Sequence, residues 1–153
     1  MKLKSLFMET TKISSSQTVG EIQHLLGSYG ATAILLEYSN GEVIAVSFKI
    51  MVGKQEVPFR LPCRWEPIEG HLNKKHKPQK YVYSGETRIR DNTDQAKRVA
   101  WRQILRWIEA QLALTDTGMV KIQEVFLPYM LGDSGETLYE MIEKKQFMIE
   151  YKK

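Results

Sequence analysis

The spacing of apolar residues predicts a helix in the first fifth of the chain. After a polar stretch ending at Gln17, apolar residues recur every three or four positions, at Val19, Ile22, Leu25, Leu26 and Tyr29. This period places them on one face of a helix. Thr18 and Glu21 have the spacing of a capping box, so the helix is predicted to begin at Thr18. Gly30 stands where a left-handed C-terminal cap would end it.

From residue 31 the period changes to two, which is typical of strands with one buried face. The runs ATAILLEY and EVIAVSFKIMV are separated by Asn40-Gly41, a pair that favours a tight hairpin turn. A second turn near Gly53 leads to a third run, QEVPFRLP. Its two prolines, Pro58 and Pro62, cannot donate ladder hydrogen bonds, so this strand is predicted to lie at an edge or to end by Pro62.

The longest helical pattern covers residues 94–114. One face of this helix gathers apolar residues, and we predict that it is buried: Ala96, Ala100, Ile104, Trp107, Ile108 and Leu112. Arg98, Arg102 and Arg106 follow one another at four-residue intervals on the opposite side. The pattern therefore predicts a helix with one buried apolar face and an exposed arginine stripe on the opposite face.

Shorter patterns complete the chain. Residues 119–126 fit either a short helix or a strand, limited by Pro128. Residues 136–145 predict a short terminal helix, and residues 147–149 could add a last docking segment. Residues 1–17 are interpreted as a flexible lead-in or an edge strand, and residues 66–93 as a mobile basic loop, in which residues 81–83 and 87–90 could be short strands.

These elements predict one α+β domain spanning residues 1–153. It comprises an N-terminal helix, a three- to four-stranded antiparallel meander, a long helix packed on the sheet and a short C-terminal helix. A chain of 153 residues with 42% apolar residues is long enough to bury a core without covalent staples. With no signal-like start, no long apolar run and a single cysteine, we expect no membrane segment and a cytoplasmic location.

Catalytic and metal-binding patterns are weak. Cys63, His71 and His76 lie in one region, but a structural zinc site needs four ligands at tighter spacings. Arg64 next to Cys63 could activate a thiol, yet no catalytic signature surrounds it, and no phosphate-binding glycine loop occurs. We therefore predict no enzymatic activity, no cofactor and no metal.

Positive charge is concentrated between residues 71 and 106, where ten lysines and arginines face three acidic residues, a net charge of +7. Aromatic side chains interrupt this basic segment. Cationic groups for phosphates beside aromatic rings for bases are what single-stranded nucleic acid requires. The predicted binding residues are Lys74, Lys75, Lys77, Lys80, Tyr81, Tyr83, Arg88, Arg90, Arg98, Arg102 and Arg106.

Three other interpretations use the same residues. The charges could form a solvated surface, with Arg98 paired to Asp94 and Arg106 to Glu109 at helical spacing. They could dock on an acidic protein surface, or occupy the groove in which a partner enzyme holds its own nucleic acid. They could also form salt bridges within a homo-oligomer, as in a purely structural subunit.

Four strings carry a resemblance to small proteins encoded by phages and prophages of Gram-positive-type bacteria. They are ETTKISSSQTVGEIQHLLGSYGATAILLEYSNGEVIAVSFKI, FRLPCRW, AKRVAWRQILRWIEAQLAL and VFLPYML, and the similarity spans roughly residues 10–143. The resemblance implies an accessory protein of phage replication or recombination, or an inhibitor of host defence such as an anti-CRISPR protein. It brings no established chemistry and no catalytic residue.

Overall fold

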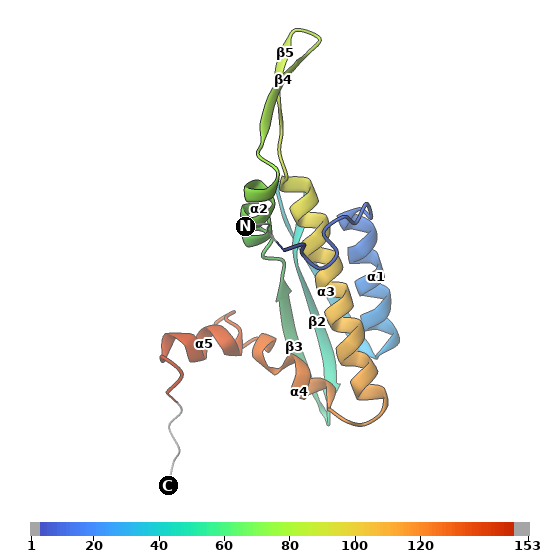
Figure 1. The fold of residues 1–153 in the computed structure, drawn as a ribbon. Coiled ribbons are helices and arrows are strands. Elements are labelled where there is room, and N and C mark those ends of the chain that lie inside the picture. Colours follow the sequence, from blue (N-terminus) through green and yellow to red (C-terminus); the bar gives the residue numbers. More distant parts are fainter. Residues whose placement is uncertain (1–3, 149–153) are drawn as a thin grey trace. The chain divides into compact units, whose positions relative to one another are not determined.

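A computed structural model describes residues 4–148 (Figure 1). Its elements are α1 (Ser15–Ser28), β1 (Ala31–Ser39), β2 (Glu42–Val52), β3 (Gln55–Pro62), α2 (Glu66–Lys75), β4 (Gln79–Tyr83), β5 (Glu86–Arg90), α3 (Thr93–Asp116), α4 (Ile122–Phe126), the 3-10 helix η1 (Leu127–Tyr129) and α5 (Leu138–Lys144). The predicted α+β class and the predicted succession of N-terminal helix, meander, long helix and short last helix are confirmed.

The chain divides into two compact units. The first comprises Met1–Glu21 and Cys63–Trp107, and the second comprises Ile22–Pro62 and Ile108–Lys153. The boundaries fall within α1 and α3, so each of these helices contributes residues to both units. That the chain is a single domain stays a prediction.

The second unit is built on an antiparallel sheet with the strand order β1-β2-β3. Asn40 and Gly41 have φ angles of 50° and 79°, the left-handed values that the predicted hairpin turn needs. Strand β3 ends at Pro62 and lies at an edge, as its prolines predict. The register pairs Phe48 with Phe59, which places both rings on one face of the sheet.

That face holds the aromatic core of the second unit. The Phe48 and Phe59 rings stack with centroids 5.3 Å apart, and Phe126 of α4 meets Phe48 edge-on at 5.2 Å. All three side chains are buried, together with Ile108 and Leu112 from the last turns of α3. Residues 119–126 were predicted as either a short helix or a strand, and the structure has a helix there, at residues 122–126.

In the first unit, the predicted loop is wrong for residues 66–75, whereas the short strands suggested at residues 81–83 and 87–90 are found within β4 and β5. Residues 66–75 form α2, and the chain then forms a hairpin of β4 and β5. The helix has Pro67 in its first turn, acidic Glu66 and Glu69 near its start, and basic residues in its last turn. This arrangement complements the helix dipole. The shortage of apolar residues concealed it, because only Leu72 of α2 is buried.

The N-terminal segment forms no strand over residues 4–14, and hydrogen bonds attach it to α3. Gln95 of α3 donates two hydrogen bonds from Nε2, to the carbonyl oxygens of Glu9 (2.8 Å) and Thr11 (2.9 Å). Helix α1 also begins earlier than predicted, at Ser15. The N-terminal cap is Ser14, whose Oγ accepts a hydrogen bond from the Gln17 backbone N–H, so Thr18 lies inside the helix.

The buried face of α3 is broader than predicted. Trp101, Val99 and Leu105 are buried in addition to the predicted alanines, whereas Ile104 and Trp107 are half-buried. Within the first unit, other chain segments contact α3 on more than one side, so a single apolar stripe does not describe it. Residues 147 and 148, predicted to dock, are exposed, and residue 149 lies outside the described part of the chain.

Candidate nucleic-acid interface

The β4–β5 hairpin exposes every one of its strand residues. It projects beyond α2 and the first turn of α3 (Figure 1). Ser84 and Gly85 form its turn with φ angles of 53° and 79°. An isolated two-stranded hairpin is only marginally stable in water. Because none of the strand side chains is buried, packing within the chain does not explain why these residues are present. Its side chains are therefore candidates for contacts outside the chain.

The register divides the predicted binding residues between two faces of the hairpin. Tyr81 is paired with Arg88, and Tyr83 with Glu86. Because paired residues of antiparallel strands lie on the same face, and alternate residues return to it, Arg90 also belongs to this face. We call Tyr81, Tyr83, Arg88 and Arg90 the aromatic face.

Cations and rings contact each other within the aromatic face. The Arg88 guanidinium carbon lies 5.0 Å from the centroid of the Tyr83 ring, and that of Arg90 lies 5.6 Å from the Tyr81 centroid. Both distances are within the range of cation–π attraction. The rings remain 41% (Tyr81) and 59% (Tyr83) exposed. The contacts thus orient the four side chains without covering them.

The opposite face carries a different chemistry. Lys80 is paired with Ile89, and Val82 with Thr87. Val82 is 71% exposed and Ile89 is 59% exposed. We call these four residues the aliphatic face. Of the aliphatic face, only Lys80 was among the residues predicted to bind. The grouping of the other three residues depends on the strand register, which the sequence does not reveal.

The base of the hairpin is fixed by Asn92. Its Nδ2 donates hydrogen bonds to the His76 carbonyl oxygen (2.7 Å) and to Asn73 Oδ1 (2.8 Å). One side chain thereby ties the strand leaving the hairpin to the end of α2, where the chain enters it. The backbone carbonyl of Asn92 also accepts a hydrogen bond from the Ala96 N–H, at the start of α3.

The predicted lysines do not behave alike. Lys74, Lys77 and Lys80 are exposed. Lys75 donates to Glu9 Oε2 at 2.7 Å, and the two side chains are 24% and 11% exposed. This hydrogen bond lowers the pKa of the Glu9 carboxyl below its ordinary value. Lys75 therefore ties the N-terminal segment to α2, and its assignment to a binding surface stays a prediction.

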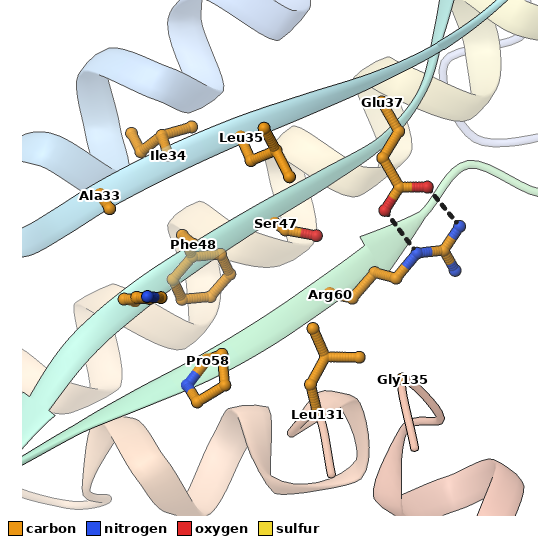
Figure 2. A pocket seen from close by; sticks show the side chains of 11 residues that line it. Ala33, Ile34, Leu35, Glu37, Ser47, Phe48, Pro58, Arg60, Leu131 and Gly135 are labelled. Atoms are coloured by element: carbon orange, nitrogen blue, oxygen red, sulfur yellow. Dashed lines mark hydrogen bonds and ion pairs between the residues drawn. The ribbon is translucent and has the colours of Figure 1, made fainter. Parts of the chain in front are cut away.

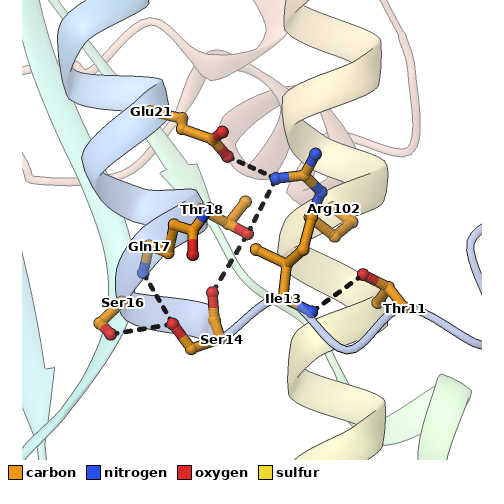
Figure 3. A network of polar contacts seen from close by, with 8 residues as sticks. All are labelled: Thr11, Ile13, Ser14, Ser16, Gln17, Thr18, Glu21 and Arg102. Carbon is orange, nitrogen blue, oxygen red and sulfur yellow. Dashed lines mark hydrogen bonds and ion pairs between the residues drawn. The ribbon is translucent and has the colours of Figure 1, made fainter.

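The predicted arginine stripe on α3 is wrong in its central member. Arg102 is buried, with 3% of its surface exposed. Figure 3 shows its guanidinium reaching α1, where it forms an ion pair with Glu21 and donates to Thr18 Oγ1 at 3.4 Å. The Thr18 hydroxyl in turn donates to the Ser14 carbonyl oxygen. Thr18 and Glu21, predicted as a capping box, instead anchor Arg102.

The other two arginines of α3 do not restore a stripe. Arg98 is half-buried and donates two hydrogen bonds to Gln95 Oε1, at 2.7 and 3.0 Å. This contact orients Gln95, which holds the N-terminal segment. Arg106 is exposed. Two of the three arginines thus serve the interior of the first unit, and the hairpin carries the exposed combination of charge and aromatic rings.

Cys63 offers no reactive thiol. Burial, with a smaller contribution from the charge of Glu66, raises the pKa of the Cys63 thiol to about 12, so the thiol stays protonated at neutral pH. His71 Nε2 lies 3.1 Å from the Lys4 carbonyl oxygen. Among residues 4–148, no group of three or more histidine, cysteine, aspartate and glutamate side chains is placed to hold a metal ion.

No protein-family model, curated protein or solved structure matches the chain. Over the described residues, none of the helices has both the length and the apolar character needed to cross a membrane. The similarity to small phage proteins stays a prediction, and the hairpin geometry is what any functional proposal has to rest on.

Proposed function

We propose that the chain is a non-enzymatic phage accessory protein that binds nucleic acid, preferably single-stranded, through the aromatic face of the β4–β5 hairpin. The observation that carries this proposal is the grouping of Tyr81, Tyr83, Arg88 and Arg90 on one exposed face. The exposed lysines Lys74 and Lys77 near its base add positive charge for phosphates. The site of action would be the cytoplasm of the bacterial host.

The spacing of the rings supports a single strand over a duplex. Tyr81 and Tyr83 are two residues apart on one strand, which separates them by about 7 Å. Bases in a duplex strand are stacked about 3.4 Å apart and cover each other's faces. Rings at twice that spacing suit an extended strand, in which each tyrosine stacks on a separate unstacked base.

Fluorescence anisotropy of a labelled single-stranded oligonucleotide, with its duplex for comparison, tests the proposal. We expect tighter binding to the single strand, weakening between about 50 and 200 mM salt. Tyr81→Ala and Tyr83→Ala should each weaken binding about 5- to 150-fold, which corresponds to roughly 1–3 kcal/mol per stacked base. Absence of binding at the lower salt concentration would refute the proposal.

Val82→Ala is the matched control, since Val82 lies between the two tyrosines on the same strand but on the aliphatic face. It should leave the affinity for the oligonucleotide unchanged. Equal losses in all three variants would mean that binding depends on the hairpin fold and not on base stacking. Unchanged melting temperatures are expected for all three, because the side chains are exposed.

One observation favours a second candidate, an inhibitor that binds a host defence nuclease or its complex. Exposed apolar side chains such as Val82 and Ile89 are typical of protein interfaces more than of phosphate-binding surfaces. For this candidate, Ile89→Asp should abolish inhibition of the nuclease, whereas Tyr83→Ala should have the smaller effect. The reverse order of effects would favour nucleic-acid binding.

A further inference from the structure

The two edges of the β1-β2-β3 sheet differ in how far they are protected from pairing with a further strand. The β3 edge is covered, because the Leu131 N–H donates to the Pro58 carbonyl oxygen at 2.9 Å and Met130 forms an antiparallel bridge with Phe59. Leu131 lies beside Pro58 in Figure 2. Pro58 and Pro62 also remove backbone donors from this strand, so a further strand cannot add there along its full length.

The β1 edge lacks this protection. Within residues 4–148, β1 forms ladder hydrogen bonds with β2 alone. Native proteins shield such edges with lysines, prolines, short strands or bulges. Strand β1 is nine residues long and contains neither lysine nor proline, although register shifts near its two ends interrupt those parts of the edge. Its one charged residue, Glu37, is bound by Arg60, with Oε1 2.8 Å from Nε and Oε2 3.0 Å from the terminal nitrogen (Figure 2).

The bulges of β1 define which part of the edge is regular. Register shifts occur between Ala31 and Ala33 and between Glu37 and Tyr38, while pairing with β2 is uninterrupted from Ala33 to Glu37. Leu35 is the centre of this window and is 64% exposed. It also lines a groove of about 750 Å³ on the outer face of the sheet, together with Ala33, Glu37 and Arg60 (Figure 2).

We infer that β1 is a dimerisation edge, which pairs antiparallel with β1 of a second copy about a twofold axis at Leu35. This arrangement joins two three-stranded sheets into one of six strands. It is isologous, as closed dimers require. It places Leu35 opposite Leu35 of the second copy, Ile34 opposite Leu36, and Ala33 opposite Glu37, so the three central pairs are apolar and the two outer pairs match a small residue with Glu37.

Charge does not oppose this pairing. The two Glu37 residues would lie four positions apart along the paired strands, about 14 Å. That separation exceeds the screening length of about 8 Å at physiological salt, and Arg60 neutralises each carboxylate. A second copy is therefore the partner whose sequence suits this edge, because a strand paired with itself brings no unmatched charge to Leu35.

Sedimentation equilibrium of the full chain tests the inference. We expect twice the chain mass of 17.7 kDa at tens of micromolar protein, and a monomer for Leu35→Lys under the same conditions. Met119→Lys is the matched control, since Met119 is a comparably exposed apolar residue of the second unit, and it should remain dimeric. A monomeric native chain, or a Leu35→Lys variant that still dimerises, would overturn the inference.

The register has its own test. A bifunctional thiol reagent spanning about 5 Å should cross-link Leu35→Cys into dimers, because residues facing each other across the axis lie about 5 Å apart. Tyr38→Cys, which is exposed but lies three residues from the axis, should not be cross-linked. Cys63 is buried, and the unmodified chain reports its background. Equal cross-linking of both variants would exclude the proposed axis.

Discussion

The described residues, 4–148, contain two antiparallel β-structures that differ in what they bury. The β1-β2-β3 sheet packs Phe48 and Phe59 into an aromatic core, whereas β4 and β5 bury no residue at all. Local signals are alike in both, with turns that adopt left-handed φ angles at Asn40-Gly41 and Ser84-Gly85. The difference shows that turn chemistry sets where a hairpin forms, while its surroundings decide whether its side chains stabilise the fold or remain available to a ligand.

The largest expected effect lies in the core of the sheet. Phe48→Ala removes a ring packed between two others and should lower the free energy of unfolding by about 3–5 kcal/mol. Tyr83→Ala, in the hairpin, should change it by no more than about 0.5 kcal/mol. Urea denaturation measures both. A comparable loss for Tyr83→Ala would show that the hairpin contributes to the folded core.

Two arginines of the first unit should show opposite behaviour. Arg102→Ala breaks a buried contact to α1 and should cost about 1.5–3 kcal/mol of stability. Arg88→Ala should leave stability nearly unchanged and weaken oligonucleotide binding. Thermal melting and anisotropy on the same samples distinguish the two roles. If Arg102→Ala folded normally and bound poorly, the binding surface would include α3 after all.

Glu86 provides a gain-of-function test of the aromatic face. Glu86 lies opposite Tyr83 in the strand register, and its carboxylate lies 3.6 Å from the Arg88 guanidinium. Since it sits beside the positive charge proposed to hold phosphates, Glu86→Gln should raise oligonucleotide affinity by about two- to fivefold. The increase should shrink at higher salt. A decrease in affinity would indicate that Glu86 positions Arg88 for binding.

The smallest effect concerns pH. Because the hydrogen bond from Lys75 lowers the pKa of Glu9 in the folded state, the unfolded chain binds this proton more readily. The resulting stability is present above the unfolded pKa of about 4.3 and is lost as pH falls through the folded value. The stability difference between the native chain and Glu9→Gln should therefore narrow as the pH is lowered from 6 to 3. Lys75→Met should remove the same dependence.

The sheet was predictable because each of its signals is local. Alternating apolar residues, the Asn40-Gly41 turn and the prolines of β3 all act on neighbouring backbone, and all were confirmed. Helix α2 was missed because its charge distribution, and not its apolar pattern, marks it. The start of α1 was misplaced since Ser14 and Thr18 are both capable caps, and the contact of Thr18 with Arg102 is between residues distant in sequence.

The candidate interface was predicted in part. The sequence singled out the tyrosines and arginines of residues 81–90, and strand register places them on one exposed face. The sequence did not reveal that Arg98 and Arg102 contact other residues of the first unit. Arginines spaced four residues apart on a helix form the same sequence pattern whether they face water or a second helix. The contact of Lys75 with Glu9 was missed for the same reason, because Glu9 lies far away in sequence.

The order and type of most elements, the turns and the concentration of positive charge follow from the sequence alone, since backbone propensity and composition act over a few residues. Packing determined which charges remain exposed. Arg88 and Arg90 lie over tyrosine rings on an exposed hairpin, and Arg102 lies among buried groups, although all three belong to one basic segment. Which arginines are exposed and which are buried depends on which distant segments of the chain pack together. A charged side chain that is taken out of water must find a partner within the protein.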